Sequence, residues 1–543
     1  MHSSLRYVQI AILSLILFVP FLGQVHLFDW DEINFAECAR EMMVSKDYLR
    51  MQIDFQPFYE KPPLFIWLQV LSMKLFGINE FAARFPNALA GMATLLALFY
   101  IGKKVVNEKM AFWWVILYAG TWLPHFYFKT GIIDPIFNLF IFLAFYQVYR
   151  LKADARKGLH ILLAGLFIGL AVLTKGPVAI LVSVLSFGVY IIINRGLKGY
   201  YWLHLVLIAI LSLGVTSVWF GVELAQNGST FLKEFISYQA GLFSQNIADH
   251  AEPWYYHPIV LLIGCFPASL FLFQYNKNRN SIRSTSYEFS RWMWILFWVV
   301  LILFSIVKTK IVHYSSLCYY PLTFLAAIQL YRLAEQQIKL KKIVVVLLLF
   351  VGSVWGILLT ALPFVGVYKT NLIPYIKDPF AVGNLQADVP WSLAESLFGL
   401  LYLAAVWICV LLLRKDFKKG MFIMAIVQVV MIQVTMLHFV PKIEGYSQRA
   451  AIEFYKSKKG QDVYVQVLGF HSYAYLFYTQ KQPVANKKYY DKTWLIDGSV
   501  DKPTFFVCKI QDAGHYRGNS NLKVLYEKNG FVFFQRKTIG QTP

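Results

Sequence analysis

Long apolar segments separated by short charged loops dominate the chain from its start to about residue 440. A membrane-spanning helix needs about 20 mostly apolar residues, and thirteen stretches come near that length. They are 7–25, 82–101, 111–126, 132–149, 159–173, 176–193, 202–223, 257–275, 292–307, 314–331, 343–364, 391–413 and 421–439. As one helix, 159–193 would be longer than a bilayer is thick, so its Lys175-Gly176-Pro177 interruption predicts two short helices.

The distribution of basic residues predicts the orientation of these spans. With the N-terminus inside, the inner loops are rich in lysine and arginine, whereas the outer short loops carry one or two lysines. The first stretch is long for a signal peptide and lacks a small-x-small cleavage site, so we expect it to be a retained span. Thirteen crossings then place the C-terminal segment outside.

The chain changes character near Pro441. Short alternating runs at 463–468, 504–508 and 530–535 are separated by glycine, asparagine and aspartate, which is typical of strands and turns. We expect a transmembrane domain over 1–440 and a small extracytoplasmic α/β domain over 441–543. Three long loops also fall outside, and long loops in compact proteins are usually functional; these loops are 26–81, 224–256 and 365–390.

Composition agrees with an α-helical polytopic membrane protein. The 543 residues are 58% hydrophobic and 15% charged, with a mean hydropathy of +0.51, whereas about a quarter of a soluble domain is charged. The net charge of +21 lies mostly in membrane-flanking loops, which argues against nucleic acid as a partner. The five cysteines are scattered and have no metal-ligand spacing, so we expect them to be buried apolar residues.

The first outer loop concentrates charged residues that are costly near a bilayer unless they have a function. Asp29, Asp31 and Glu32 stand within four residues, and Glu60-Lys61 precedes two prolines that fix a turn. The alternative is that Asp29 and Glu32 form a capping box for an amphipathic helix over 31–45 that lies on the membrane. A simple turn would also explain the prolines, although it would not need the Glu-Lys pair.

Other outer ends of spans add polar groups on the same predicted face. Asp134 opens the fourth span, where a helix cap is the alternative, and Lys175 is a cation in an apolar hairpin that needs a partner. The remaining members of this face are His250, Lys308, Lys310, His313 and Tyr314. Acids and bases together suit a phosphate-linked donor, because lysines hold a leaving phosphate and a carboxylate removes the acceptor's proton.

Several of these segments together resemble a known family. Asp31 to Met42, Tyr59 to Pro63, Phe76 to Pro86, Leu173 to Pro177 and His250 to Tyr256 are similar to bacterial aminoarabinose-transferase-like glycosyltransferases. These are GT-C enzymes related to protein O-mannosyltransferases. The motifs cover roughly residues 1–330, and the layout of spans and outer domain is similar throughout.

The resemblance implies an inverting transferase that uses an undecaprenyl-phosphate-linked sugar, and no nucleotide cofactor, at the periplasmic face of a bacterial inner membrane. It implies Asp31 as the catalytic base, and Glu60 with His250 as ligands of a divalent metal ion. We add Glu32 and Asp134 to Asp31 as candidate catalytic residues. The resemblance also implies Lys61 as a donor-phosphate ligand. The further donor-phosphate candidates are Tyr59, Lys175, Lys308, Lys310 and Tyr314.

One departure leaves the substrates open. The aminoarabinose branch is expected to have Thr-Arg after the Asp-Glu pair, where this chain has Ile33-Asn34. Aminoarabinose transfer to lipid A is the leading specific hypothesis, and another sugar transferred to lipopolysaccharide, another lipid or a protein is the alternative. We expect a monomer in contact with membrane lipids. The sequence leaves two alternatives for the outer domain: it guides the acceptor, or it covers the active-site loops.

Two other classes of function predict different patterns. A transporter or lipid flippase would place charges at the bilayer midplane and would show pseudo-repeated broken helices. In this sequence the charges gather at one face, and no repeat is visible. A non-catalytic membrane scaffold would leave the two charged motifs of the first outer loop unexplained. The transferase is therefore the hypothesis that the sequence favours.

Overall fold

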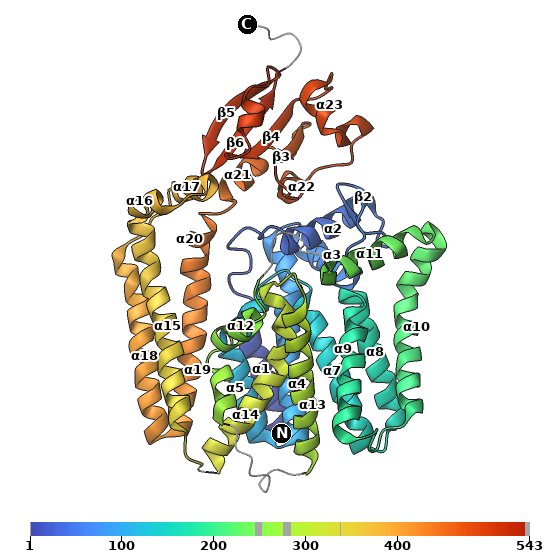
Figure 1. Cartoon of the computed structure of the whole chain (residues 1–543), viewed down its shortest axis with the longest axis vertical. Coiled ribbons are helices and arrows are strands. Elements are labelled where there is room, and N and C mark those ends of the chain that lie inside the picture. The colour runs from blue at the N-terminus through green and yellow to red at the C-terminus, as the bar shows by residue number, and fades with distance from the viewer. Residues whose placement is uncertain (1, 245–251, 275–283, 337, 538–543) are drawn as a thin grey trace.

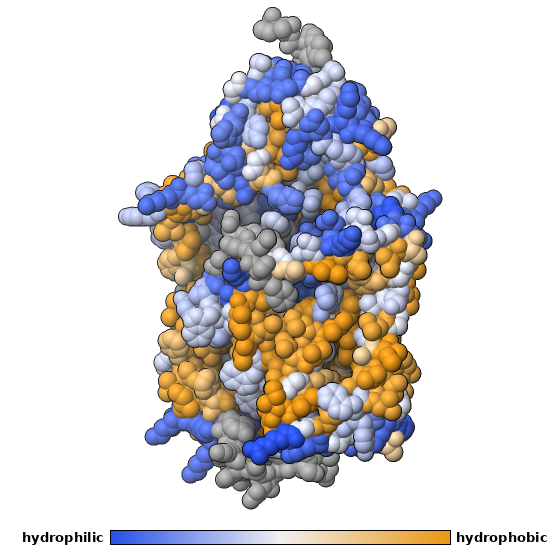
Figure 2. All heavy atoms as spheres, turned by 45° about the vertical axis from the view of Figure 1, so that its right-hand side comes forward, coloured by the Kyte–Doolittle hydropathy of each residue, from blue (hydrophilic) through white to orange (hydrophobic). Residues whose placement is uncertain are grey.

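A bundle of long helices carries a small sheet domain at one end (Figure 1). The computed structural model describes residues 2–244, 252–274, 284–336 and 338–537. The N-terminus lies at the end of the bundle opposite the sheet domain. Figure 2 shows hydrophobic residues in a broad band over the helical body, with hydrophilic residues below it and over the sheet domain. This is the surface of a protein that spans a membrane.

Each of the thirteen predicted stretches contains a helix. The helices of the bundle are α1 (His2–Phe18), α4 (Glu80–Val105), α5 (Glu108–Ala119), α6 (Trp122–Tyr127), α7 (Asp134–Ala153), α8 (Lys157–Lys175), α9 (Val178–Asn194), α10 (Trp202–Asn227), α12 (Tyr256–Gly264), η2 (Ala268–Gln274), α13 (Ser284–Ile306), α14 (Tyr319–Glu335), α15 (Lys342–Val367), α18 (Ser396–Lys415) and α19 (Phe417–Val434). Within the described residues, seven helices are long and apolar enough to cross a membrane, and α12 with η2, bent by 99°, would form an eighth. The number of thirteen crossings therefore stays a prediction.

The interrupted stretch forms two helices, as predicted. Helix α8 ends at Lys175, and Gly176 takes a φ of 88° before α9 begins, a conformation that glycine adopts without steric cost. Gly165 and Gly169 on one face of α8 let α10 approach closely. A Cβ on Gly165 would lie 2.5 Å from the Cβ of Leu211. This is the small-residue packing that joins helices in lipid, where apolar side chains gain little by leaving the membrane.

Shorter elements cover the end of the bundle next to the sheet domain. They are α2 (Asp31–Ser45), β1 (Gln52–Ile53), β2 (Gln56–Pro57), α3 (Leu64–Phe76), α11 (Thr230–Ser244), η4 (Val312–Cys318), α16 (Lys369–Leu372), η5 (Ile373–Tyr375), α17 (Pro379–Leu385) and η6 (Leu393–Glu395). Helix α2 has the predicted bounds, but it does not lie on the membrane surface. Its residues from Glu32 to Met42 are all buried, between the bundle and the sheet domain (Figure 1).

The predicted capping box at the start of α2 is wrong. Trp30 occupies the cap position with a φ of 70°, and no side chain caps the helix. The Asp29 side chain accepts a hydrogen bond from the backbone N–H of Trp30, and Glu32 accepts one from the N–H of Phe28. Glu32 is therefore free to pair with a residue from another helix.

The C-terminal segment forms the expected small α/β unit. Its sheet has the strand order β3-β4-β6-β5, in which β3 pairs parallel with β4 and the other pairs are antiparallel. The strands are β3 (Tyr464–Leu468), β4 (Thr504–Lys509), β5 (Leu522–Lys528) and β6 (Phe531–Arg536). The helices are α20 (Val440–Glu444), α21 (Arg449–Ser457), α22 (Ala474–Thr479), η8 (Lys487–Tyr490), α23 (Lys492–Asp497) and α24 (Gly514–Arg517), and the π-helix η7 (Thr435–Phe439) links α19 to α20.

The β5–β6 hairpin attaches this domain to the bundle. Asn529 and Gly530 both have positive φ, at 51° and 79°, as the tight two-residue turn of a hairpin requires. A Cβ added at Gly383 of α17 would lie 2.4 Å from the Cα of Gly530. This close approach holds the sheet domain against the 365–390 loop.

Candidate functional site

A cavity of about 560 Å³ lies at the end of the bundle that carries the C-terminal domain. It is bounded by α2 and the loop before it, by the ends of α8 and α13, by η4 and by α11. Its apolar lining includes Leu123, Phe126, Ile133, Val178 and Phe304. Its charged and polar lining includes Asp31, Glu32, Asn34, Glu60, Lys61, Asp134, Lys175, Tyr238, Gln239, His313, Tyr314, His471 and Tyr473.

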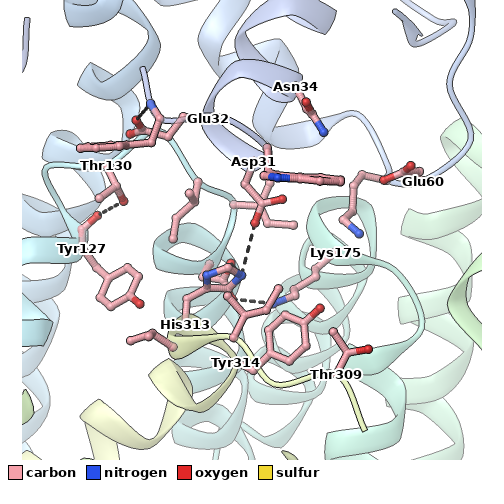
Figure 3. Close-up of a pocket in the computed structure, with 18 of the residues that line it drawn as sticks. Asp31, Glu32, Asn34, Glu60, Tyr127, Thr130, Lys175, Thr309, His313 and Tyr314 are labelled. Atoms are coloured by element: carbon pink, nitrogen blue, oxygen red, sulfur yellow. Dashed lines mark hydrogen bonds and ion pairs between the residues drawn. The ribbon is translucent and has the colours of Figure 1, made fainter. Parts of the chain in front are cut away.

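Asp31 is the open carboxylate of this cavity. It is the first residue of α2 and directly follows the turn at Trp30. Its side chain is 35% exposed. The Nε2 atom of His313 lies 3.3 Å from Oδ2 of Asp31 and 3.9 Å from Oδ2 of Asp134. Figure 3 shows His313 pointing toward Asp31 across the cavity. The imidazole therefore orients Asp31 and leaves it accessible to a bound molecule.

Asp134 is already neutralised by a protein partner. The Nζ of Lys175 lies 2.5 Å from Oδ1 of Asp134, and the two side chains are 13% and 2% exposed. Lys175 also lies over the rings of Phe137 and Tyr314, at 5.6 and 5.1 Å from their centroids. The partner that the sequence predicted for Lys175 is thus a carboxylate of the chain itself. A phosphate would have to share this ammonium with Asp134.

Among the residues that the structure describes, Lys61 has no carboxylate partner. Its ammonium lies 5.0 Å from the ring centroid of Tyr238 on α11, and within the described ranges no carboxylate lies at ion-pair distance from it. Loss of hydration lowers the pKa of Lys61, against the nearby charges of Glu60 and Asp31. A half-buried cation without an ion pair is suited to bind an anionic ligand.

Glu32 lines the cavity, but both of its oxygens have partners. Arg84 of α4 donates to them from Nε at 2.9 Å and from Nη2 at 2.7 Å, and the N–H groups of Phe28 and Gly131 donate as well. Burial opposes ionisation, yet Arg84 and these N–H groups hold the pKa of Glu32 below its ordinary value. We propose a positioning role for Glu32 in place of the predicted catalytic one.

Replacing Arg84 with methionine is expected to destabilise the protein by about 3–5 kcal/mol, because it leaves the Glu32 carboxylate buried without its countercharge. Arg84 also donates to the carbonyls of Leu22, Val25 and His26, so the loop before α2 would lose its anchor. Thermal unfolding in lipid nanodiscs measures the effect. Adding Glu32→Gln should restore part of the loss. An unchanged melting temperature for the single variant would contradict the proposed role of the pair.

A second buried charge cluster joins α2 to the C-terminal domain. Arg40 donates to both oxygens of Glu37, at 2.7 and 2.6 Å, and to the carbonyl of Lys481 at 2.8 Å. Lys481 in turn pairs with Asp54 in the β1–β2 turn. Burial and the neighbouring Glu37 raise the pKa of Glu41 to about 9. Glu41 is therefore protonated at neutral pH, and the cluster fixes the helix that presents Asp31.

The pH dependence of stability should reveal Glu41. Its folded pKa of about 9 exceeds its ordinary value of 4.5, so unfolding releases a proton between these values and stability falls as pH rises through this window. Above about pH 9 the effect is constant. Glu41→Gln keeps a neutral side chain of the same shape and should flatten the melting temperature between pH 5 and 9. Equal slopes for the variant and the wild type would show that another group is responsible.

The structure does not bring all predicted donor ligands into the cavity. Tyr59 is half-buried and packs edge-on against Phe231, with ring centroids 5.5 Å apart. Lys308 is exposed and Lys310 is buried, and neither lines the cavity. Their predicted roles stay predictions. Tyr314 lines the cavity beside Lys175, as expected for a donor ligand.

Of the two residues predicted to bind a metal ion, the structure describes one. Glu60 lines the cavity, whereas His250 lies outside the described residues. In the part of the chain that the structure describes, no group of three histidine, cysteine, aspartate or glutamate side chains is placed to hold a metal ion. We therefore derive no chemical step from a metal.

Sequence reasoning gave no role to several residues of the cavity. Tyr238 and Gln239 come from α11, and the amide of Gln239 donates to the carbonyl of Glu60 at 2.9 Å. His471 and Tyr473 come from the loop after β3. The only signal in the sequence was that both segments belong to outer, non-membrane regions. Their contact with residues more than 150 positions away is a property of the tertiary fold.

The fold and the cavity define a class of protein. It is a multi-pass helical membrane protein with an acidic and basic cavity at one end of its bundle, covered by a small α/β domain. This is the architecture expected of GT-C proteins.

Comparisons with known proteins agree with that class. Residues 60–220 match the family described as dolichyl-phosphate-mannose-protein mannosyltransferase. An undecaprenyl phosphate-alpha-4-amino-4-deoxy-L-arabinose arabinosyl transferase of Edwardsiella ictaluri is 29% identical over 64% of this chain and 63% of its own length. One from Proteus mirabilis is 30% identical over 57% of this chain and 56% of its own length. The matched region spans less than two thirds of these relatives.

The solved structures extend the likeness to the whole fold. The crystal structure of ArnT from Cupriavidus metallidurans bound to undecaprenyl phosphate has a TM-score of 0.79 at 17% identity, with 99% of each chain covered. Its apo form has a TM-score of 0.74. The resemblance drawn from the motifs is confirmed as a similarity in sequence, and the structural likeness shows that the chain has the GT-C fold.

Proposed function

We propose that this protein is an inverting glycosyltransferase that takes a sugar from a polyprenyl-phosphate donor. The proposal is carried by one observation: the open carboxylate of Asp31 and the ammonium of Lys61, which forms no ion pair with the described residues, line the same cavity together with apolar side chains. Proton acceptance and phosphate binding are the two tasks of such a transfer. The names of the sequence relatives and the ligand of the ArnT structure support the same reaction.

The proposed step is a single displacement at the anomeric carbon. The acceptor oxygen forms a bond to that carbon as the bond to the donor phosphate oxygen breaks. Asp31 takes the acceptor's proton, with His313 holding the carboxylate in place. The leaving group is polyprenyl phosphate, whose charge Lys61 and Lys175 stabilise. Where the acceptor is itself a phosphate oxygen, little proton transfer is needed, and Asp31 acts by orientation and electrostatics.

The apolar part of the cavity suits the isoprenoid chain of the donor. Phe126, Ile133, Val178, Phe304 and Val307 line it at the level where α6, α7, α9 and α13 reach the outer face. Apolar lining with a few convergent polar groups is the usual composition of a small-molecule site. The proposed location is the periplasmic face of the bacterial inner membrane, with the protein as a monomer.

The proposal also concerns the identity of the sugar and of the acceptor. Aminoarabinose is the leading candidate for the sugar, given the names of the relatives, and lipid A is the acceptor that the resemblance of the motifs implies. Asn34 supports the alternative that another sugar or acceptor is used, because its buried amide lines the cavity where the aminoarabinose branch is expected to have an arginine. The loss of that cation changes the charge offered to donor and acceptor alike.

A transfer survey tests the reaction class. Purified protein in nanodiscs receives undecaprenyl-phosphate-linked aminoarabinose or hexose, and mass spectrometry follows lipid A, other glycolipids and protein. We expect one sugar mass to be added to one acceptor pool, with release of undecaprenyl phosphate. Empty nanodiscs are the control. Absence of transfer with every donor and acceptor would contradict the proposal.

A further inference from the structure

Helix α11 is held to the rest of the protein by one face. Its buried residues Phe231, Phe235 and Gln239 recur every four positions, and the half-buried Tyr238 lies beside them, whereas Ile236 is 55% exposed. Residues three or four positions apart share one face of a helix. Figure 1 shows α11 over the ends of α8 and α9 that face the sheet domain. The contacts of this face indicate what the helix does.

The buried face of α11 fixes the backbone next to Lys61. The amide of Gln239 donates to the carbonyl of Glu60 at 2.9 Å, and Phe231 packs edge-on against Tyr59, with ring centroids 5.5 Å apart. Two prolines directly follow Lys61, and their rings restrict the chain on that side. The backbone of Lys61 is therefore restrained on both sides, and the main freedom left to this residue is that of its side chain.

The ring of Tyr238 restrains that side chain. The ammonium of Lys61 lies 5.0 Å from the centroid of this ring, within the range of a cation–π contact. The attraction comes from the quadrupole of the ring, so it leaves the charge of the ammonium uncompensated. A carboxylate in the same place would neutralise the ammonium and accept its N–H groups. An aromatic partner therefore orients Lys61 and keeps it available to an anion.

Glu60 is the carboxylate that could neutralise Lys61 from the adjacent position. Among the described residues, no ion pair joins the two side chains. Burial and the neighbouring Glu60 carboxylate raise the pKa of the Tyr238 hydroxyl. This hydroxyl is therefore protonated at neutral pH and serves as a hydrogen-bond donor to Glu60. One tyrosine thus contacts both members of the Glu-Lys pair, each with the part of the side chain that suits its charge.

The same face of α11 also reaches the turn beside Lys175. A Cβ added at Gly176, the next residue after Lys175, would lie 2.8 Å from Cζ of Phe235. Helix α11 therefore packs against both chain segments that bring a lysine into the cavity. Its position determines how the Lys61 and Lys175 segments lie relative to one another.

We propose that Tyr238 is a positioning residue for the donor phosphate: its ring directs the Lys61 ammonium into the cavity, and its hydroxyl holds Glu60 away from that ammonium. The inference rests on the proposed function and deepens it, because it assigns the arrangement of the phosphate site to α11. A free lysine side chain loses rotamer entropy when it binds a ligand. A lysine that is already oriented loses less, so Tyr238 increases donor affinity through Lys61.

A double-mutant cycle tests the inference, with undecaprenyl phosphate titrated into the full-length protein in nanodiscs. Tyr238→Leu should raise the Kd about five- to twentyfold, whereas Tyr238→Phe keeps the ring and should raise it less than about threefold. In a Lys61→Ala background, Tyr238→Leu should cause no further rise, because the tyrosine acts through Lys61. Ile236→Ala, on the exposed side of α11, is the matched control and should leave the Kd unchanged.

Turnover supplies a second readout: Tyr238→Leu should raise the KM for the donor, while kcat stays within about threefold of the wild type. An equal rise in Kd when Tyr238→Leu is placed in the wild type and in Lys61→Ala would indicate a general structural effect and overturn the inference. An unchanged Kd in Tyr238→Leu, where Lys61→Ala does raise it, would also overturn the inference but leave the proposed function intact. A wild-type protein that did not bind undecaprenyl phosphate would refute the proposed donor, and the inference with it.

Discussion

Asp31→Asn is expected to lower the rate of sugar transfer by a factor on the order of 10² to 10⁴, the range for loss of a general base. Asp31 is the more open of the two aspartates that face His313, since Asp134 is buried against Lys175. The amide keeps the shape of the side chain but cannot accept the acceptor's proton. The measurement is kcat in nanodiscs at saturating donor and acceptor.

Two measurements test whether Asp31→Asn loses transfer activity through misfolding. The melting temperature of Asp31→Asn should stay near that of the wild type, because among the described residues the Asp31 carboxylate pairs with His313 alone, at 3.3 Å, and the substitution leaves the Glu32–Arg84 pair intact. The binding of undecaprenyl phosphate should also be retained. Transfer at the wild-type rate would remove Asp31 from the mechanism.

Lys61→Ala should weaken donor binding by about 1.5–3 kcal/mol, which is roughly a 10- to 100-fold rise in Kd. The physical reason is the loss of a charge-assisted contact between the ammonium and the donor phosphate. Lys61 is suited to this contact because no carboxylate of the described chain pairs with it, in contrast to Lys175. Titration of undecaprenyl phosphate into nanodisc samples measures the change.

Lys74→Ala is the matched control, since Lys74 belongs to the next helix and lies over the ring of Tyr48, 4.4 Å from its centroid. Its donor affinity should equal that of the wild type. If Lys61→Ala bound the donor as tightly as this control, Lys61 would have no role in phosphate binding.

The helices and the breaks between them were largely predictable. The length of an apolar segment, and the glycine and proline residues that interrupt it, are local features of the sequence. The break at Gly176 and the bounds of α2 match the prediction. Strand β5 was missed, because it lies at the edge of the sheet and most of its residues are at least partly exposed, so no apolar alternation marks it. The capping box failed because the positive φ of Trp30 turns the chain before any side chain can cap α2.

The sequence predicted which charged residues belong to the site, but it did not predict which of them pair with one another. The sequence placed Asp31, Lys61, Asp134 and Lys175 on one face, and all four line the cavity. The role of Glu32 depends on Arg84, which is 52 positions away. Such long-range pairings follow from packing, and no spacing rule within one segment reveals them. The same holds for the cavity itself, whose lining combines residues of α2, α11, η4 and the loop after β3.

The most direct test of the central claim is single-turnover sugar transfer by three matched proteins. Wild type, Asp31→Asn and Asp462→Asn are loaded with radiolabelled undecaprenyl-phosphate-linked sugar and mixed with the acceptor that the survey identifies. Asp462 is a carboxylate on the outer domain whose side chain is 82% exposed. We predict that label moves to the acceptor in the wild type and in Asp462→Asn, and stays on the donor in Asp31→Asn. Equal transfer by all three proteins would contradict a reaction centred on Asp31.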